Sequence, residues 1–190
     1  MTDSFNCLMN EVTKISGGLE LGFNHGLKQT QIESQLKNQK IVLPGDLLSA
    51  YECMNGNRRL EKEGKLYWDQ SIVPLFKGAF HFISLQESLN WINDDVNFWI
   101  PKGHFPIASR VERDYLSINL DTGELVVLGT YTLQQTVAEN FSQFVLQYIA
   151  GLQDGSYVLD VKYQYYPRIV HYSDVGEETL RNTFTGIDIG

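Results

Sequence analysis

A long apolar stripe in the second half of the chain limits its fold more than any other feature. Apolar residues recur at helical spacing over 137–152, namely Val137, Phe141, Phe144, Val145, Tyr148, Ile149 and Leu152. A helix with one apolar face must bury that face against another layer of structure. Thr136 and Glu139 have the form of a capping box, so the sequence predicts that this helix begins directly after Thr136.

The residues before this helix predict a β-hairpin. In DYLSINL, apolar and polar side chains alternate, with Leu116, Ile118 and Leu120 on one side and Tyr115, Ser117 and Asn119 on the other. A period of two predicts a strand with one buried face. The sequence Asp121-Thr122-Gly123 is typical of a hairpin turn, and 124–131 is therefore expected to return antiparallel.

Four further helices are expected earlier in the chain. One spans 4–16, with Phe5, Leu8 and Val12 on its apolar face, and ends at Gly17-Gly18. A short helix carrying Ile32 and Leu36 is predicted to open with a capping box of Thr30 and Glu33. Pro44 is placed to open a helix that Asn55-Gly56 would stop with a left-handed cap. Ser84 and Glu87 form the capping box of a fourth helix, which carries Leu85, Leu89 and Ile92.

The remaining strands are shorter. They are expected at 65–68, 79–83 and 97–100, and in a tyrosine-rich segment after Gly155. The segment 57–64 is interpreted as a charged connection, and a last short helix is predicted near 177–184. Helices before a hairpin sheet and a long covering helix after it favour an α+β fold of one domain.

An ordered set of pieces resembles the SUKH superfamily of small α+β domains. The pieces are LPGDLLSAYECMNG, HFPIAS, DYLSINLDTGELVVL and NFSQFVLQYI. The resemblance implies a twisted, mainly antiparallel sheet flanked by helices. It covers 27–152 as a core, with 1–26 as an N-terminal helical extension and 153–190 as a C-terminal extension packed on the core.

Bulk composition predicts a soluble cytoplasmic protein. Of the 190 residues, 43% are hydrophobic and 20% charged, and no apolar run is long enough to span a membrane. The N-terminus lacks the pattern of a signal peptide. The two cysteines, Cys7 and Cys53, both fall in predicted helices, so reduced thiols are expected rather than a disulfide.

The net charge of −8 excludes some partners and favours others. A protein that binds a phosphate backbone directly needs a basic stripe, and the sequence has none. Complementary charge would speed the capture of a basic protein, although most acidic proteins are simply soluble.

Signatures of catalysis are weak. The four histidines have no metal-ligand spacing, and no nucleophile, phosphate-binding or dinucleotide-binding motif occurs. Cys53 paired with a distant histidine could act as a nucleophile, but a cysteine on a helix more often packs. The run PKGH at 101–104 resembles many surface loops. No catalytic residue, metal or cofactor is predicted.

Candidate partner-binding residues come in two groups. Acidic pairs occur at Asp94 and Asp95 and at Glu112 and Asp114, and each could be a docking surface or a solvated loop end. The tyrosines of the C-terminal extension, represented by Tyr163 and Tyr165, could cover the core or form a partner surface.

The resemblance implies a non-catalytic binding protein. Bacterial SUKH domains are similar to immunity proteins, which neutralise toxins by direct contact, and the expected partner is a basic toxin domain. An alternative is a regulatory or scaffold module in cell-wall or signalling pathways. A third hypothesis is an enzyme with a dispersed site. The oligomeric state stays open.

Overall fold

The computed structural model describes most of the chain, as residues 2–17, 19, 21–62, 65–68, 73–77, 80–93, 100–110, 114–129, 134–160 and 167–174. The helices are α1 (Thr2–Ile15), α2 (Gln29–Gln39), α3 (Gly45–Cys53), α4 (Leu85–Asn93) and α5 (Phe141–Gln153), with a short 3-10 helix at Tyr172–Asp174. The strands are β1 (Phe23–His25), β2 (Met54–Asn57), β3 (Arg59–Lys62), β4 (Lys65–Trp68), β5 (His81–Phe82), β6 (His104–Arg110), β7 (Asp114–Asn119), β8 (Leu125–Gly129), β9 (Gln135–Ala138), β10 (Tyr157–Asp160) and β11 (Arg168–His171).

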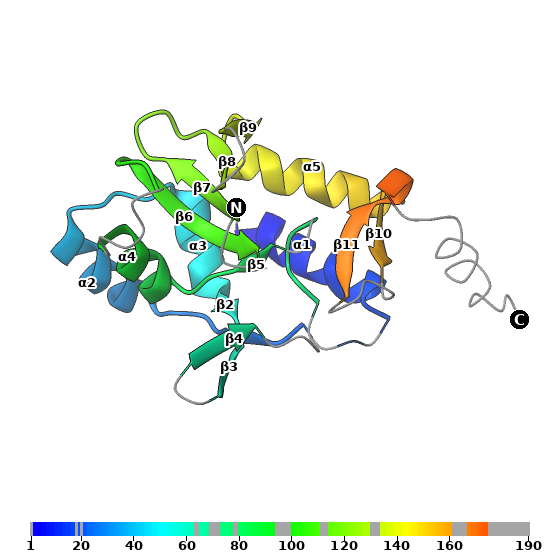
Figure 1. Cartoon of the computed structure of the whole chain (residues 1–190), viewed down its shortest axis with the longest axis horizontal. Coiled ribbons are helices and arrows are strands. Elements are labelled where there is room, and N and C mark those ends of the chain that lie inside the picture. The colour runs from blue at the N-terminus through cyan, green and yellow to red at the C-terminus, as the bar shows by residue number, and fades with distance from the viewer. Residues whose placement is uncertain are drawn as a thin grey trace, which may run out of the picture.

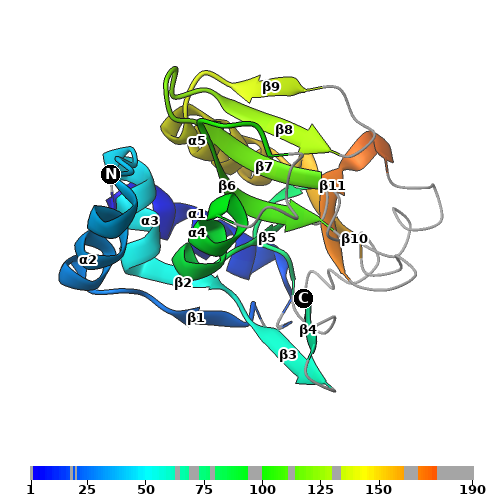
Figure 2. The same cartoon turned by 60° about the vertical axis from the view of Figure 1, so that its left-hand side comes forward.

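A five-stranded antiparallel sheet lies at the centre of the fold, in the order β5-β6-β7-β8-β9. Three antiparallel strand pairs, β1–β2, β3–β4 and β10–β11, lie outside it (Figure 2). The predicted α+β fold, a mainly antiparallel sheet flanked by helices in one domain, is confirmed. The predicted β7–β8 hairpin is confirmed too, and Gly123 in its turn has a φ of +80°.

Helices α1, α3 and α5 pack against one face of this sheet (Figure 1). Phe82 of β5 stacks on Tyr51 of α3, with ring centroids 5.1 Å apart, and lies 6.1 Å from Phe5 of α1. Phe5 in turn lies 6.4 Å from Phe141, the first residue of α5. The helix at the N-terminus therefore contributes to the same core as the sheet.

The opposite face of the sheet is buried as well. Tyr115 and Ser117 of β7 are 3% and 0% exposed. Trp91 of α4 meets the ring of Tyr115 edge-on at 5.2 Å. The prediction that this strand has only one buried face is therefore wrong, because α4 packs on the side that the alternating pattern marked as polar.

The start of α5 also differs from the prediction. Thr136 lies in β9, opposite Val126 of β8, and the helix begins at Phe141. Its N-cap is Asn140, whose Oδ1 accepts a hydrogen bond from the Gln143 N–H at 2.8 Å. The sequence thus contains two possible helix caps, Thr136 and Asn140. Thr136 does not cap the helix because it pairs with β8 in the sheet.

Asn55 and Gly56 do not cap α3. The helix ends at Cys53, and both residues lie in strand β2, where Gly56 keeps a φ of +80°. A Cβ atom on Gly56 would lie 2.5 Å from the backbone nitrogen of Ser84. Glycine is therefore required here by a close approach of two backbones as well as by its φ.

Three smaller predictions also need correction. Helix α2 begins at Gln29, and the backbone N–H of Lys28 donates to Gln31 Oε1, so Thr30 is not its cap. The segment 57–64, predicted to be a connection, contains β3, which pairs with β4. The strand predicted at 79–83 is reduced to β5. In contrast, the Ser84 capping box is confirmed, since Ser84 N–H and Oγ both donate to Glu87 Oε2.

Parts of some predicted elements lie outside the described residues. These parts are position 79 and 97–99 of two predicted strands, 130–131 at the end of the returning hairpin strand, 161–166 of the tyrosine-rich segment and the predicted helix near 177–184. Within the described part, β10 confirms the first half of the tyrosine-rich strand. Its Tyr157 ring lies over Gly151 of α5, where a Cβ atom would come within 2.3 Å of the ring.

We predict that Gly56→Ala destabilises the fold far more than Gly123→Ala. Both glycines have a φ of +80°, so both substitutions cost about 1–2 kcal/mol in backbone strain. A Cβ on Gly123 meets nothing within 4 Å, whereas one on Gly56 meets the backbone of Ile83 and Ser84. Urea denaturation should therefore show at least about 2 kcal/mol of additional loss for Gly56→Ala. Equal losses would mean that the two backbones are not in close contact.

We also predict that removal of the hydroxyl group changes the free energy of unfolding differently at two buried tyrosines. Tyr51 OH lies 3.2 Å from Ser88 Oγ, whereas Tyr148 OH, on a residue only 2% exposed, has no hydrogen-bond partner among the described residues. Tyr51→Phe should lower the free energy of unfolding by about 1 kcal/mol. Tyr148→Phe should leave it unchanged or raise it. Thermal unfolding of the two variants tests this, and a clear loss in Tyr148→Phe would contradict it.

Candidate functional site

A groove with a mainly apolar lining lies beside α4. Its volume is about 240 Å³. The apolar residues that line it are Ile41, Trp91, Ile92, Ile100, Pro101 and Leu120. Lys102, Gly103 and His104 complete the lining. We name this feature the α4 groove.

Four separate parts of the chain form the α4 groove. Ile41 comes from the connection between α2 and α3, and Trp91 and Ile92 come from the last turn of α4. The third part, 100–104, leads into β6, and the fourth, Leu120, directly follows β7. There the Leu120 N–H donates to the Gly103 carbonyl at 2.7 Å, which fixes that wall of the groove.

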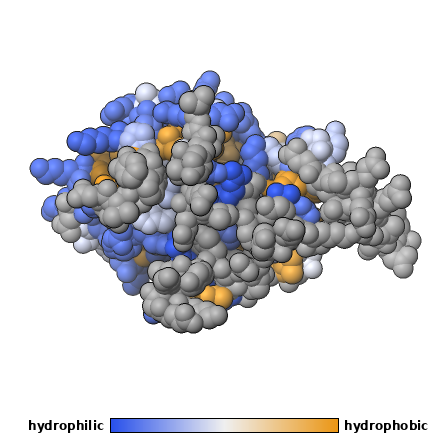
Figure 3. All heavy atoms as spheres, in the orientation of Figure 1, coloured by the Kyte–Doolittle hydropathy of each residue, from blue (hydrophilic) through white to orange (hydrophobic). Residues whose placement is uncertain are grey.

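An exposed apolar residue neighbours one of the residues that line the α4 groove. Val42, next to Ile41 in the chain, is 86% exposed. Among the coloured atoms of the face drawn in Figure 3, hydrophilic residues dominate and hydrophobic ones form separate spots. A single exposed apolar side chain is ordinary, whereas an apolar depression is a common feature of binding surfaces.

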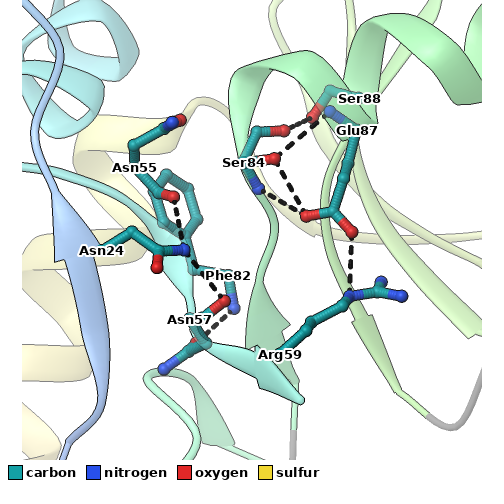
Figure 4. A network of polar contacts seen from close by, with 8 residues as sticks. All are labelled: Asn24, Asn55, Asn57, Arg59, Phe82, Ser84, Glu87 and Ser88. Carbon is teal, nitrogen blue, oxygen red and sulfur yellow. Dashed lines mark hydrogen bonds and ion pairs between the residues drawn. The ribbon is translucent and has the colours of Figure 1, made fainter. Parts of the chain in front are cut away.

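Strand β2 is joined to β5 and to the start of α4 through two asparagines. Asn57 Oδ1 accepts the Phe82 N–H at 2.8 Å (Figure 4). Asn55 Oδ1 accepts the Leu85 N–H at 2.9 Å. These amide groups flank Gly56, whose lack of a side chain lets the two segments meet. The first turn of α4 is thereby fixed to β2, because the Leu85 N–H at its start finds an acceptor there.

Arg59 of β3 holds the middle of α4. Its Nε lies 2.8 Å from Glu87 Oε1, and its guanidinium carbon lies 5.7 Å from the centroid of the Trp91 ring (Figure 4 shows the ion pair). The Arg59 side chain is largely buried, so this ion pair and the cation–π contact are shielded from water. Trp91 is thus held between Arg59 and Tyr115 while it also lines the groove.

His104 is the polar side chain in the wall of the α4 groove. The side chain is half-buried, and neither ring nitrogen has a hydrogen-bond partner in the part of the chain that the structure describes. Lys102, two residues earlier, is exposed at the rim. The groove therefore combines apolar walls with one unsatisfied imidazole, which suits a mainly apolar ligand with one polar group.

Most of the predicted partner residues lie outside the described residues: Asp94, Asp95, Glu112, Tyr163 and Tyr165. Asp114 is described. Its Oδ2 accepts hydrogen bonds from Nε and the terminal guanidinium nitrogen of Arg110 on the neighbouring strand. The Arg110 guanidinium also lies over the ring of Phe80 at 5.3 Å. The Asp114 charge is thus engaged within the sheet.

The thiol of Cys53 does not have the surroundings of an activated nucleophile. Partial burial, and then the nearby Glu52 carboxylate, raise its pKa above the ordinary value. Its Sγ donates to Asn6 Oδ1 at 3.6 Å, and both cysteines are free. A thiol with a raised pKa carries less thiolate at neutral pH, which makes it a poorer nucleophile.

The described ranges contain no cluster of three or more histidine, cysteine, aspartate or glutamate side chains with metal-binding geometry. None of the described helices is both long enough and apolar enough to cross a membrane.

The sequence alone gave little sign of the α4 groove. Ile92 and Leu120 were expected to be core residues, and PKGH at 101–104 was interpreted as an ordinary surface loop. The signal present in the sequence was the clustering of tryptophans in the middle of the chain, which included Trp91. Compared with known proteins, the chain matches no family model and no curated protein.

We predict that His81, beside Arg59, makes stability fall as the pH is lowered. Burial, and then the positive charge of Arg59, lower the pKa of His81 to about 3 from its ordinary value near 6.5. Between these values the unfolded chain binds a proton that the folded chain does not. Stability is therefore complete above about pH 6.5 and falls below it, by about 1.4 kcal/mol for each pH unit.

Urea denaturation between pH 7 and pH 4.5 measures this slope. His81→Gln should flatten it, whereas the matched variant His25→Gln should not, since His25 is exposed. An identical slope in wild type and His81→Gln would show that other groups cause the pH dependence.

Proposed function

We propose that the chain is a non-catalytic protein-binding domain that acts in the cytoplasm as an immunity protein. In this role it neutralises a cognate bacterial toxin by direct contact, docking through the α4 groove. The partner covers the groove with an apolar side chain and is held there by exclusion of water.

The observation that carries this proposal is the α4 groove with its mainly apolar lining, together with the exposed Val42 next to Ile41 in the chain. A solvent-exposed apolar depression is costly for a protein that has no use for it, because its surface stays in contact with water. Trp91 adds an aromatic side chain of the type that contributes most at interfaces. Its ring is held by Arg59 and Tyr115, so little side-chain entropy is lost on binding.

The net charge supports a basic partner. At −8, the chain attracts a positively charged protein over a distance comparable to the Debye length, which raises the rate of association. A toxin that acts on nucleic acid needs a basic surface of this kind. A SUKH-like domain that covers such a surface would exclude the toxin's substrate.

The arrangement of the motifs is compatible with the proposed family. The four pieces that resemble SUKH domains lie in α3, β6, the β7–β8 hairpin and α5, respectively. All four contribute buried residues to one core, among them Leu47, Phe105, Ile118 and Phe144. These motifs therefore have a structural role, and recognition of the partner belongs to surface residues.

We predict that Val42→Arg weakens binding to the natural partner at least tenfold. The substitution places a positive charge and a longer side chain next to Ile41, which lines the groove, and this charge repels a basic partner docked there. Because Val42 is 86% exposed, the free energy of unfolding should change by less than about 0.5 kcal/mol. The measurement is affinity for the partner purified with the tagged chain from its native cells.

Leu146→Arg is the matched control. It introduces the same charge at a residue of α5 that is 54% exposed, on the helix layer across the sheet from α4. This variant should keep its affinity within about twofold, apart from the general effect of one charge on association. Equal losses in both variants would indicate an effect of net charge alone, and an unchanged affinity in Val42→Arg would exclude the groove as the docking site.

A further inference from the structure

We propose that the α4 groove recognises a tyrosine side chain of the basic partner and that His104 binds its hydroxyl group. This inference rests on the proposed function, since it identifies the side chain that enters the same groove. The partner segment consists of a tyrosine flanked by lysine or arginine residues.

The size of the groove fits one aromatic ring. A cavity of about 150 Å³ is sufficient to bind benzene in a protein interior. At about 240 Å³, the α4 groove has room for a phenol ring and the carbon that attaches it to the backbone. Trp91, Ile92 and Leu120 supply apolar surface against which such a ring can pack.

His104 supplies the polar contact. Both of its ring nitrogens are covered by protein, and neither bonds to any described residue. A buried polar atom without a partner costs free energy, so the ring gains by turning a nitrogen towards a partner. A half turn about the Cβ–Cγ bond exchanges Nδ1 with Cδ2 and Nε2 with Cε1. The ring can thereby present a nitrogen where a carbon lies now.

The chemistry of an imidazole favours a hydroxyl group as the ligand. A neutral histidine has one donor and one acceptor nitrogen, and which nitrogen is which depends on its tautomer. A phenol hydroxyl can donate or accept, so it pairs with either nitrogen, whereas the indole of tryptophan can only donate. Phenylalanine would fill the groove but leave the imidazole unsatisfied.

The charges at the rim favour a neutral group in the groove. Lys102 is exposed there, and Asp121 Oδ2 lies 3.4 Å from the position that a Cβ on Gly103 would occupy. An ion of either sign would therefore meet a like charge as well as an opposite one. The tyrosine hydroxyl stays uncharged, and the flanking basic residues respond to the net charge of −8 over the wider surface.

The test uses two peptides that differ by one oxygen atom. Both are acetylated and amidated: Lys-Lys-Gly-Tyr-Gly-Lys-Lys and the same sequence with phenylalanine in place of tyrosine. Each is titrated into the full chain, and binding is followed by the NMR signal of the Trp91 indole N–H. The tyrosine peptide should bind about fivefold more tightly, the value of one net hydrogen bond.

The variant His104→Leu should reduce this preference to about one, and His104→Gln should restore part of it because an amide can donate and accept. The inference is overturned by equal affinities in the wild-type chain, or by a preference that survives in His104→Leu. It is also overturned if neither peptide gives a saturable shift of the Trp91 signal at millimolar concentration.

The two proposals fail in different ways. If the peptides are not distinguished but Val42→Arg still releases the natural partner, recognition of tyrosine is wrong and docking in the groove stands. If the tyrosine peptide is preferred while Val42→Arg leaves partner binding intact, the groove binds tyrosine but is not where the natural partner docks.

Discussion

The close approach of β2 to the backbone of Ile83 and Ser84 is the constraint on which the rest of the structure depends. It is possible because Gly56 has no side chain and tolerates a positive φ. The amides of Asn55 and Asn57 then bond to backbone N–H groups on either side of the contact. Three consecutive residues thereby join a strand from the first third of the chain to the edge of the central sheet and to the start of α4.

The position of the α4 groove follows from this contact. Arg59 comes two residues after the end of β2, so fixing β2 also brings Arg59 to Glu87 and Trp91. The helix lies on a sheet face that is buried yet partly polar, since His81, Ser109 and Ser117 are all buried there. The Oγ atoms of both serines lack a partner among the described residues. Leu85 and Leu89 bury the apolar side of α4 in the core, polar bonds fix its N-terminal end, and its last turn forms one wall of the groove.

Local patterns predicted the elements that need little information from elsewhere in the chain. The apolar faces of α1 and α5, the β7–β8 hairpin and the Ser84 capping box all depend on residues within a few positions of one another. Asn55-Gly56 was wrongly predicted to be a helix cap. A glycine with a positive φ directly after a helix gives the same local sequence pattern whether it caps the helix or makes a contact with a distant segment. Thr136 and Asn140 offered two plausible caps, and only pairing with Val126 decides between them.

The α4 groove could not be predicted from the sequence for a related reason. The residue type of Ile92 or Leu120 is the same in a core and in an open groove, so only the tertiary arrangement separates the two. The net charge, in contrast, follows directly from the sequence. A charge of −8 spread over the chain, however, favours basic proteins in general as partners. Charge and groove should therefore govern different steps of recognition. In the proposed complex, long-range attraction would set the rate of encounter and weaken with salt, whereas the fit of one side chain between Trp91 and His104 would set how long the complex lasts. The proposed immunity role requires a long-lived complex, so it assigns specificity to the groove.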